Sequence, residues 1–145
     1  MRNPNAYGIC LGMLIIFIAS ACHTPDQHLT CNDLAAHGNG VKQEDGRCLL
    51  SGDLLINQIK TASLPEGLTV QGNLTIKGSR IRQLPKGLVV EGNLSLYKTL
   101  IGSLPEDLVV LGSFYSTFGL GSPTIWCHEI PDSVIIQGRN EGCGI

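Results

Sequence analysis

Hydrophobic and polar residues alternate in two short runs between Leu68 and Lys77, with one interruption at Gly72-Asn73. The residues expected to face a core are Leu68, Val70, Leu74 and Ile76. Alternation with a period of two is typical of a β-strand and not of a helix. Glycine tolerates backbone angles that other residues resist, so Gly72 suits a bend. The pattern therefore predicts two strands joined by a bend.

The same pattern recurs at intervals of twenty residues. The repeated pairs are Leu64-Pro65, Leu84-Pro85 and Leu104-Pro105, and the repeated glycines are Gly72, Gly92 and Gly112. Ile81 and Leu84 are expected to return to the core on a third side, and Pro85 fixes a corner there. A single such coil buries too little apolar surface to fold alone, so the coils must stack. We therefore expect an all-β fold, a short single-domain β-solenoid of about four to five coils.

One alternative is an antiparallel meander in which VQGN and VEGN form tight hairpin loops. The constant spacing and the Leu-Pro corner favour coils. The two interpretations differ in the direction of neighbouring strands, which is parallel in a solenoid and antiparallel in a meander.

The segments LTIKGSRIRQLP and LSLYKTLIGSLP resemble the bacterial leucine-rich repeat, whose core reads LxLxxNxLxxLP. Ser79 and Thr99 occupy the asparagine position, so the buried asparagine ladder of that family is missing. The VxGN segment before each core is also an addition to the family pattern. The resemblance implies a leucine-rich-repeat-like solenoid, a repeat that several bacterial virulence effectors use. Whether the coils curve as a horseshoe or stack straight stays open.

The repeats predict where the solenoid and its two caps begin and end. The solenoid is expected over residues 48–129, with an insertion near 118–123, because the step from Leu104-Pro105 to Ile130-Pro131 is twenty-six residues instead of twenty. Residues 130–145 are expected to form a last partial coil and a C-terminal cap. Residues 31–47 are expected to form an N-terminal cap that begins with one helical turn, capped by Asn32 or Asp33.

The N-terminal residues indicate export. Residues 1–21 contain an apolar run, Ile9–Ile18, that is short for a transmembrane helix and typical of a signal peptide. Ala19-Ser20-Ala21-Cys22 resembles the bacterial lipoprotein cleavage box, which implies that Cys22 becomes the acylated, palmitate-bearing first residue. Ala-Ser-Ala also fits an ordinary signal-peptidase site, and that alternative stays open. With His23 after the cysteine, we expect a tether over 22–30 and an outer-membrane location facing the periplasm or the exterior.

Four further cysteines flank the repeats, two on each side: Cys31, Cys48, Cys127 and Cys143. By the repeat alignment, Cys48 falls in the inward position of Leu68, and Cys127 in that of Ile81. We therefore expect the disulfides Cys31–Cys48 and Cys127–Cys143 to staple the two caps. A metal site that includes His37 or His128 is the alternative, but no close Cys pair supports it.

Charge and composition favour no particular chemistry. The net charge of −2 over 145 residues gives no electrostatic reason to expect nucleic acid. No nucleophile, base and orienting acid occur at the spacing of a known motif. The histidines, among them His28, are expected to be solvated. We expect no enzyme, no catalytic residue and no cofactor.

The outward positions become more apolar toward the C-terminal end, from Thr69 through Val89 to Val109 and Ile135. The residues expected to contact a partner are Leu111, Tyr115, Phe118 and Trp126, with Val109 and Tyr97 at the edge. Tyr and Trp in exposed apolar clusters are typical of binding surfaces. The alternative is structural, because β-branched residues also suit exposed strands.

These features predict a lipid-anchored, non-catalytic binding module that presents one solenoid face to a protein or an envelope polymer. The alternative function is a structural or exclusion lipoprotein, which acts by self-association or by contact with a neighbouring membrane protein.

Overall fold

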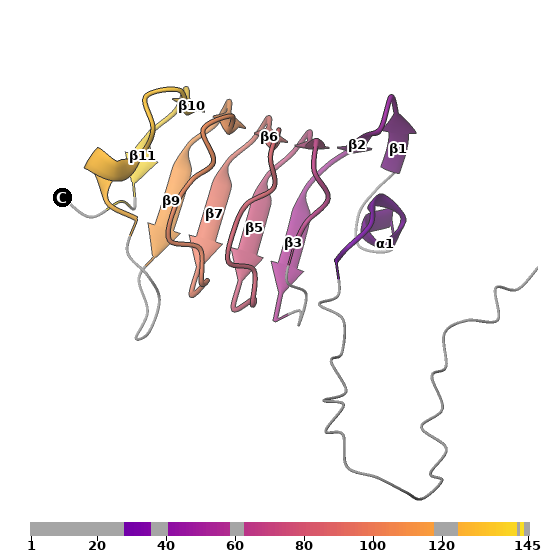
Figure 1. Cartoon of the computed structure of the whole chain (residues 1–145), viewed down its shortest axis with the longest axis horizontal. Helices are drawn as coiled ribbons and strands as arrows, with labels where there is room; N and C mark the ends of the chain where they lie inside the picture. The colour runs from indigo at the N-terminus through magenta and orange to yellow at the C-terminus, as the bar shows by residue number, and fades with distance from the viewer. Residues whose placement is uncertain (1–27, 36–40, 59–62, 118–124, 142, 144–145) are drawn as a thin grey trace, which may run out of the picture.

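The computed structural model describes residues 28–35, 41–58, 63–117, 125–141 and 143. Within them the chain winds into a β-solenoid with two strand-bearing sides and a third side of turns and extended chain (Figure 1). Three central turns, built on β4/β5, β6/β7 and β8/β9, lie between a first pair, β2/β3, and a last pair, β10/β11. The predicted fold class is confirmed.

The first sheet has the strand order β1-β2-β4-β6-β8-β10. Its strands are β1 (Val41–Glu44), β2 (Arg47–Leu50), β4 (Leu68–Val70), β6 (Val89–Val90), β8 (Val109–Val110) and β10 (Ile135–Ile136). Every neighbouring pair from β2 to β10 is parallel. Only β1 and β2 pair antiparallel, around Asp45 and Gly46, whose φ angles of 51° and 74° suit a two-residue hairpin turn.

The second sheet has the order β11-β9-β7-β5-β3, and all its pairs are parallel. Its strands are β3 (Leu54–Asn57), β5 (Leu74–Lys77), β7 (Leu94–Tyr97), β9 (Phe114–Thr117) and β11 (Asn140–Glu141). Leu74 pairs with Leu94 and Leu94 with Phe114, each one repeat apart. Parallel register at the repeat spacing excludes the antiparallel meander.

The core consists of inward columns in which each turn places a side chain on the one before. Leu68, Leu88 and Leu108 form one column and Leu74, Leu94 and Phe114 another, and all six side chains have 0% exposure. Ile81 and Ile101 complete the core from the third side. Burying each large apolar side chain contributes about 1.5 to 3 kcal/mol, so stacked turns stabilise one another.

The repeated glycines form the corner between the two sheets, which we call the glycine corner (Gly52, Gly72, Gly92, Gly112 and Gly138). A Cβ atom at Gly138 would lie 2.6 Å from the carbonyl oxygen of Gly112, and one at Gly92 would lie 2.7 Å from that of Gly72. Gly72, Gly92 and Gly112 do not have positive φ angles. At Gly72, Gly92 and Gly112 the expected reason was therefore wrong, because close stacking of successive turns requires glycine there, whereas Gly52 does have a positive φ of 95°.

The N-terminal cap contacts the third side through His28 and Leu29, which precede its helix. His28 forms a parallel bridge with Ser63, and the Leu29 amide donates to the Ser63 carbonyl at 3.2 Å. Helix α1 (Cys31–Ala35) follows. Thr30 caps it: the Thr30 amide donates to Asp33 Oδ2 at 2.8 Å, and the Asp33 amide donates to Thr30 Oγ1 at 3.3 Å. The expectation of Asn32 or Asp33 as cap residue was wrong, since Asp33 is the reciprocal partner in the first turn.

Two disulfides staple the ends as predicted, Cys31–Cys48 and Cys127–Cys143. Cys48 pairs in register with Leu68 and is 2% exposed, which confirms its inward position. Cys127 is exposed, so its predicted core position was wrong. It begins the 3-10 helix η1 (Cys127–Glu129), which turns it outward, and Ile125 is buried instead.

No helix in the described ranges is long and apolar enough to cross a bilayer.

Candidate binding surface

The outer face of the first sheet carries a column of side chains that grows more apolar along the solenoid. Thr69, Val89, Val109 and Ile135 lie in consecutive register. Ile135 is 49% exposed, and Leu111, two residues beyond Val109, is 41% exposed. The structure therefore places Val109, Leu111 and Ile135 on one side of the first sheet. We call these three residues the apolar strip.

The outer face of the second sheet carries a different column: Leu55, Thr75, Ser95, Tyr115 and Glu141. Tyr115, predicted to contact a partner, lies here and is half-buried, across the glycine corner from Leu111. Leu55 is 57% exposed, the largest value among the exposed large hydrophobic residues that the structure describes. Leu55 was not among the predicted contact residues, because it precedes the first complete repeat.

The remaining predicted contact residues lie apart from the apolar strip. Tyr97 ends β7 and lies beside Lys77 and Lys98. The ring centroid of Trp126 lies 6.1 Å from that of His128, beside the C-terminal disulfide. Phe118 falls outside the described residues. The structure thus brings Val109 and Leu111 together but separates Tyr97 from them.

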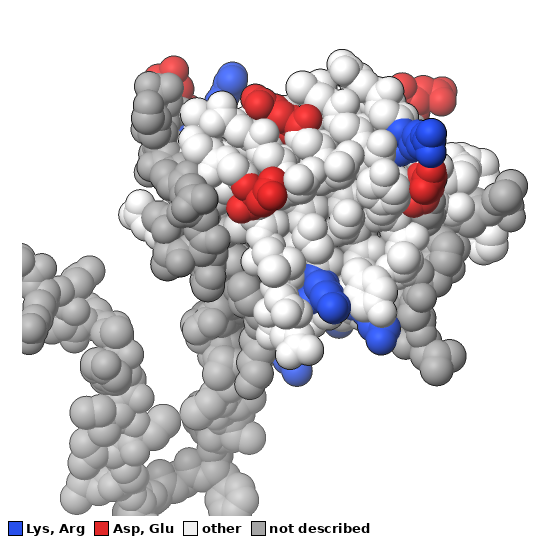
Figure 2. Space-filling model, turned by 180° about the vertical axis from the view of Figure 1, so that it is seen from behind, with Lys and Arg blue, Asp and Glu red and all other residues white. Residues whose placement is uncertain are grey.

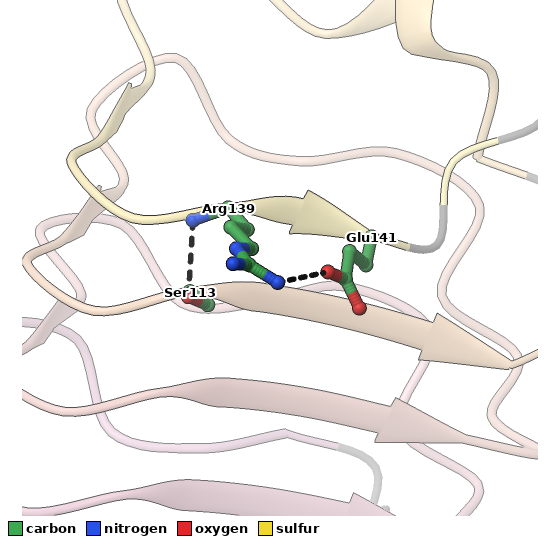
Figure 3. A network of polar contacts seen from close by, with 3 residues as sticks. All are labelled: Ser113, Arg139 and Glu141. Carbon is green, nitrogen blue, oxygen red and sulfur yellow. Dashed lines mark hydrogen bonds and ion pairs between the residues drawn. The ribbon is translucent and has the colours of Figure 1, made fainter.

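A ladder of side-chain oxygen atoms runs along the glycine corner, and sequence reasoning missed it. Each oxygen accepts a hydrogen bond from the backbone amide one turn later. The bonds run from the Asn73 amide to Asp53 Oδ1 (2.7 Å), from the Asn93 amide to Asn73 Oδ1 (2.9 Å), from the Ser113 amide to Asn93 Oδ1 (2.8 Å) and from the Arg139 amide to Ser113 Oγ (3.0 Å). Figure 3 shows the last step, where Arg139 also pairs with Glu141 at 3.4 Å. The recurring Gly-Asn dipeptide was the sequence signal for this ladder, but the same dipeptide is also typical of a bend.

A hollow of about 430 Å³ lies on the third side, between the first two Leu-Pro corners. His28, Ser63, Glu66 and Lys86 contribute its polar groups. His28 Nδ1 and Ser63 Oγ form a hydrogen bond there, which the sequence analysis did not foresee because the residues are 35 apart in the chain. Glu66 makes no hydrogen bond to His28 within the described residues.

The two ends of the solenoid differ in how well they cover the core. At the N-terminal end, Leu34 of α1 has 0% exposure. At the C-terminal end, Val134 and Ile136 are only partly buried, although Val110, the register partner of Ile136 on the preceding turn, has 0% exposure. Apolar side chains thus remain accessible at the C-terminal end, next to the apolar strip.

The described residues contain no group of three or more His, Cys, Asp or Glu side chains placed to hold a metal ion. Comparisons with protein-family models, with curated proteins and with solved structures found no match.

Proposed function

We propose that this chain is a lipid-anchored, non-catalytic binding module of the bacterial cell envelope, and that its partner is a protein or an envelope polymer. The observation that carries the proposal is the apolar strip, Val109, Leu111 and Ile135, on the outer face of a parallel sheet. Parallel sheets are usually covered on both faces, so apolar residues on an open face favour a partner.

The position of the strip supports the same proposal. The strip borders the C-terminal end, where Val134 and Ile136 are only partly buried. A partner that packs over both regions would bury the strip and complete the cover of the core. The backbone beneath the strip is held by parallel pairing, so binding requires little ordering of the chain.

The anchor is proposed from the segment Ala19-Ser20-Ala21-Cys22. Metabolic labelling with a fatty-acid analogue in a bacterial host tests it. We expect label on the wild type and none on Cys22→Ser. Label that persists on Cys22→Ser would contradict acylation at this residue.

The binding proposal is tested by capture from native envelopes after chemical cross-linking. In the double variant Leu111→Ser/Tyr115→Ser, we expect an unchanged melting temperature and loss of the captured partner, because the two side chains lie on the outer faces. Gln71→Ser/Thr75→Ser is the matched control, since Gln71 lies two repeats before Leu111 and Thr75 lies in the column of Tyr115, both near the N-terminal end. Normal capture by the folded Leu111→Ser/Tyr115→Ser protein would place the site elsewhere.

The partial burial of Val134 and Ile136 also favours a second candidate, the structural role by self-association. Two C-terminal ends could cover each other. Light scattering of the purified chain separates the two functions. A monomer at micromolar concentration supports the binding module, and a stable dimer that Ile136→Ser dissociates supports the structural role.

A further inference from the structure

Basic residues gather at the corner where the second sheet passes into the third side. This basic corner consists of the exposed side chains of Lys77, Arg80, Arg82 and Lys98. The sequence contains no Asp or Glu from residue 67 to 90, nor from 92 to 105. The nearest acidic residues lie at the other two corners, Asp53 and Glu91 beside the glycines and Glu66 and Glu106 beside the Leu-Pro pairs. The repeats between residues 67 and 105 therefore place no acidic residue at the basic corner, although the net charge is only −2.

Among the residues that the structure describes, the cations of the basic corner have no acidic partner. Within the ranges that the structure describes, the one ion pair is Arg139 with Glu141, on the last turn. Figure 2 shows a group of Lys and Arg side chains along the lower edge of one face, where no Asp or Glu is in view. Four exposed cations on one edge create a positive potential that attracts a polyanionic surface.

Two exposed apolar side chains lie among these cations. The Tyr97 ring has Lys77 Nζ at 5.2 Å and Lys98 Nζ at 5.3 Å from its centroid, and it is 37% exposed. Leu100, two residues after Lys98, is 39% exposed. Tyrosine favours the headgroup level of a bilayer because its ring is apolar and its hydroxyl is polar. Lysine and arginine in the same place pair with lipid phosphates.

The chain enters the folded body on the same side. His28, the first described residue, pairs with Ser63. By the repeat spacing, Ser63 is equivalent to Gln83, which directly follows Arg82 of the basic corner. His28 therefore contacts the third side one repeat before the residue that follows Arg82 of the basic corner.

We propose that the basic corner binds the anionic phosphate headgroups of a bilayer, with Lys77, Lys98 and Tyr97 as the principal contacts. The solenoid then rests on this edge, and the apolar strip on the first sheet stays free for the partner. The orientation rests on the proposed anchor at Cys22, whereas binding to headgroups does not.

Co-sedimentation with lipid vesicles tests the proposal without the anchor. The protein is residues 22–145 with Cys22→Ser, which contains every described residue. Vesicles of phosphatidylglycerol mixed with phosphatidylcholine are compared with vesicles of phosphatidylcholine alone. We expect binding to the anionic vesicles only, and release at high salt because the charges are exposed.

The decisive variant is Lys77→Gln/Lys98→Gln. Each cation near an anionic surface contributes about fivefold to binding, so the pair should weaken it about 25-fold. Arg47→Gln/Lys86→Gln removes the same charge from other exposed positions and should bind nearly as the wild type does. Tyr97→Ser should also weaken binding while the vesicles stay anionic. Circular dichroism confirms that each variant is folded.

The proposal would be overturned if Lys77→Gln/Lys98→Gln and the Arg47→Gln/Lys86→Gln control lost the same amount of binding to anionic vesicles. It would also be overturned if the wild type bound neutral and anionic vesicles equally. Binding to soluble polyphosphate without binding to anionic vesicles would also overturn it, in favour of an acidic polymer. Fatty-acid labelling of Cys22 is independent of these results, so failure of the anchor and failure of the basic corner remain distinguishable.

Discussion

The side-chain Oδ1 of Asn73 accepts a hydrogen bond from the backbone amide of Asn93, at 2.9 Å and one turn further along the solenoid. The Gly92 amide beside it donates to the Gly72 carbonyl, also at 2.9 Å. Side-chain and backbone bonds thus alternate at the glycine corner. The side-chain oxygen atoms satisfy amides that the bend removes from the strand ladders.

Asn93→Ala removes the acceptor of the Ser113 amide. We expect the free energy of unfolding to fall by about 1 kcal/mol, the usual net contribution of a hydrogen bond. Asn93→Asp keeps an oxygen at the same place, just as Asp53 supplies the acceptor oxygen at the N-terminal end of the ladder. Its free energy of unfolding should stay within about 0.5 kcal/mol of the wild type. Urea unfolding measures both. Equal stability of the two variants would show that the ladder contributes nothing.

Gly92→Ala and Gly78→Ala separate steric from conformational effects. A Cβ at Gly92 would lie 2.7 Å from the Gly72 carbonyl oxygen, whereas one at Gly78 meets only Gln58 Cγ at 3.5 Å. Gly78 has a φ of 57°, so Gly78→Ala should destabilise by about 1 kcal/mol through backbone strain. Gly92→Ala should destabilise by about 2 kcal/mol or more because the turns must separate. If thermal melts showed that Gly78→Ala lowers the melting temperature more than Gly92→Ala does, close stacking of the turns would not be the reason for glycine at position 92.

Ser79 is 5% exposed, and its Oγ has no hydrogen-bond partner among the described residues. A buried unsatisfied hydroxyl costs about 1 to 3 kcal/mol, so Ser79→Ala should raise the free energy of unfolding by about 1 kcal/mol. Ser103→Ala, at an exposed position, is the control and should change little. A destabilised Ser79→Ala protein would mean that the hydroxyl is bonded in solution.

The two disulfides should contribute unequally. They close loops with sequence separations of 17 and 16, which stabilise by about 3 kcal/mol each in the chain-entropy model. Cys31 and Cys48 are also buried, at 9% and 2% exposure, whereas Cys127 is exposed. Cys31→Ala/Cys48→Ala should therefore lower the melting temperature more than Cys127→Ala/Cys143→Ala. A larger loss from the C-terminal pair would contradict this packing.

The register of the central turns could be predicted because the spacing of twenty assigns every core residue to a column, including Phe114 and Cys48. The spacing does not predict which residues are buried after the insertion that follows the third Leu-Pro pair. Counting back from Ile130-Pro131 placed Cys127 inward, but η1 shifts the local phase, and Ile125 takes the buried place. A short 3-10 turn after an insertion leaves no periodic signal.

The surface was harder to predict than the core. Alternation identified the outward positions of Val109 and Ile135, and both lie where expected. Alternation also placed Tyr97 outward, one repeat after its register partner Lys77. It did not separate Tyr97 from Val109 and Leu111, because alternation does not show that the second sheet faces a different side from the first. The bond between His28 and Ser63 joins the chain ahead of the repeats to the third side, and no local pattern indicates it.

The most direct test of the binding module is photo-cross-linking from one position of the apolar strip. A photoreactive phenylalanine analogue replaces Leu111 in one protein and Thr69 in another, and each is irradiated in native envelopes. We expect a distinct adduct with another molecule from position 111 and none from position 69. No adduct from position 111, or an adduct made only of two copies of this chain, would contradict it.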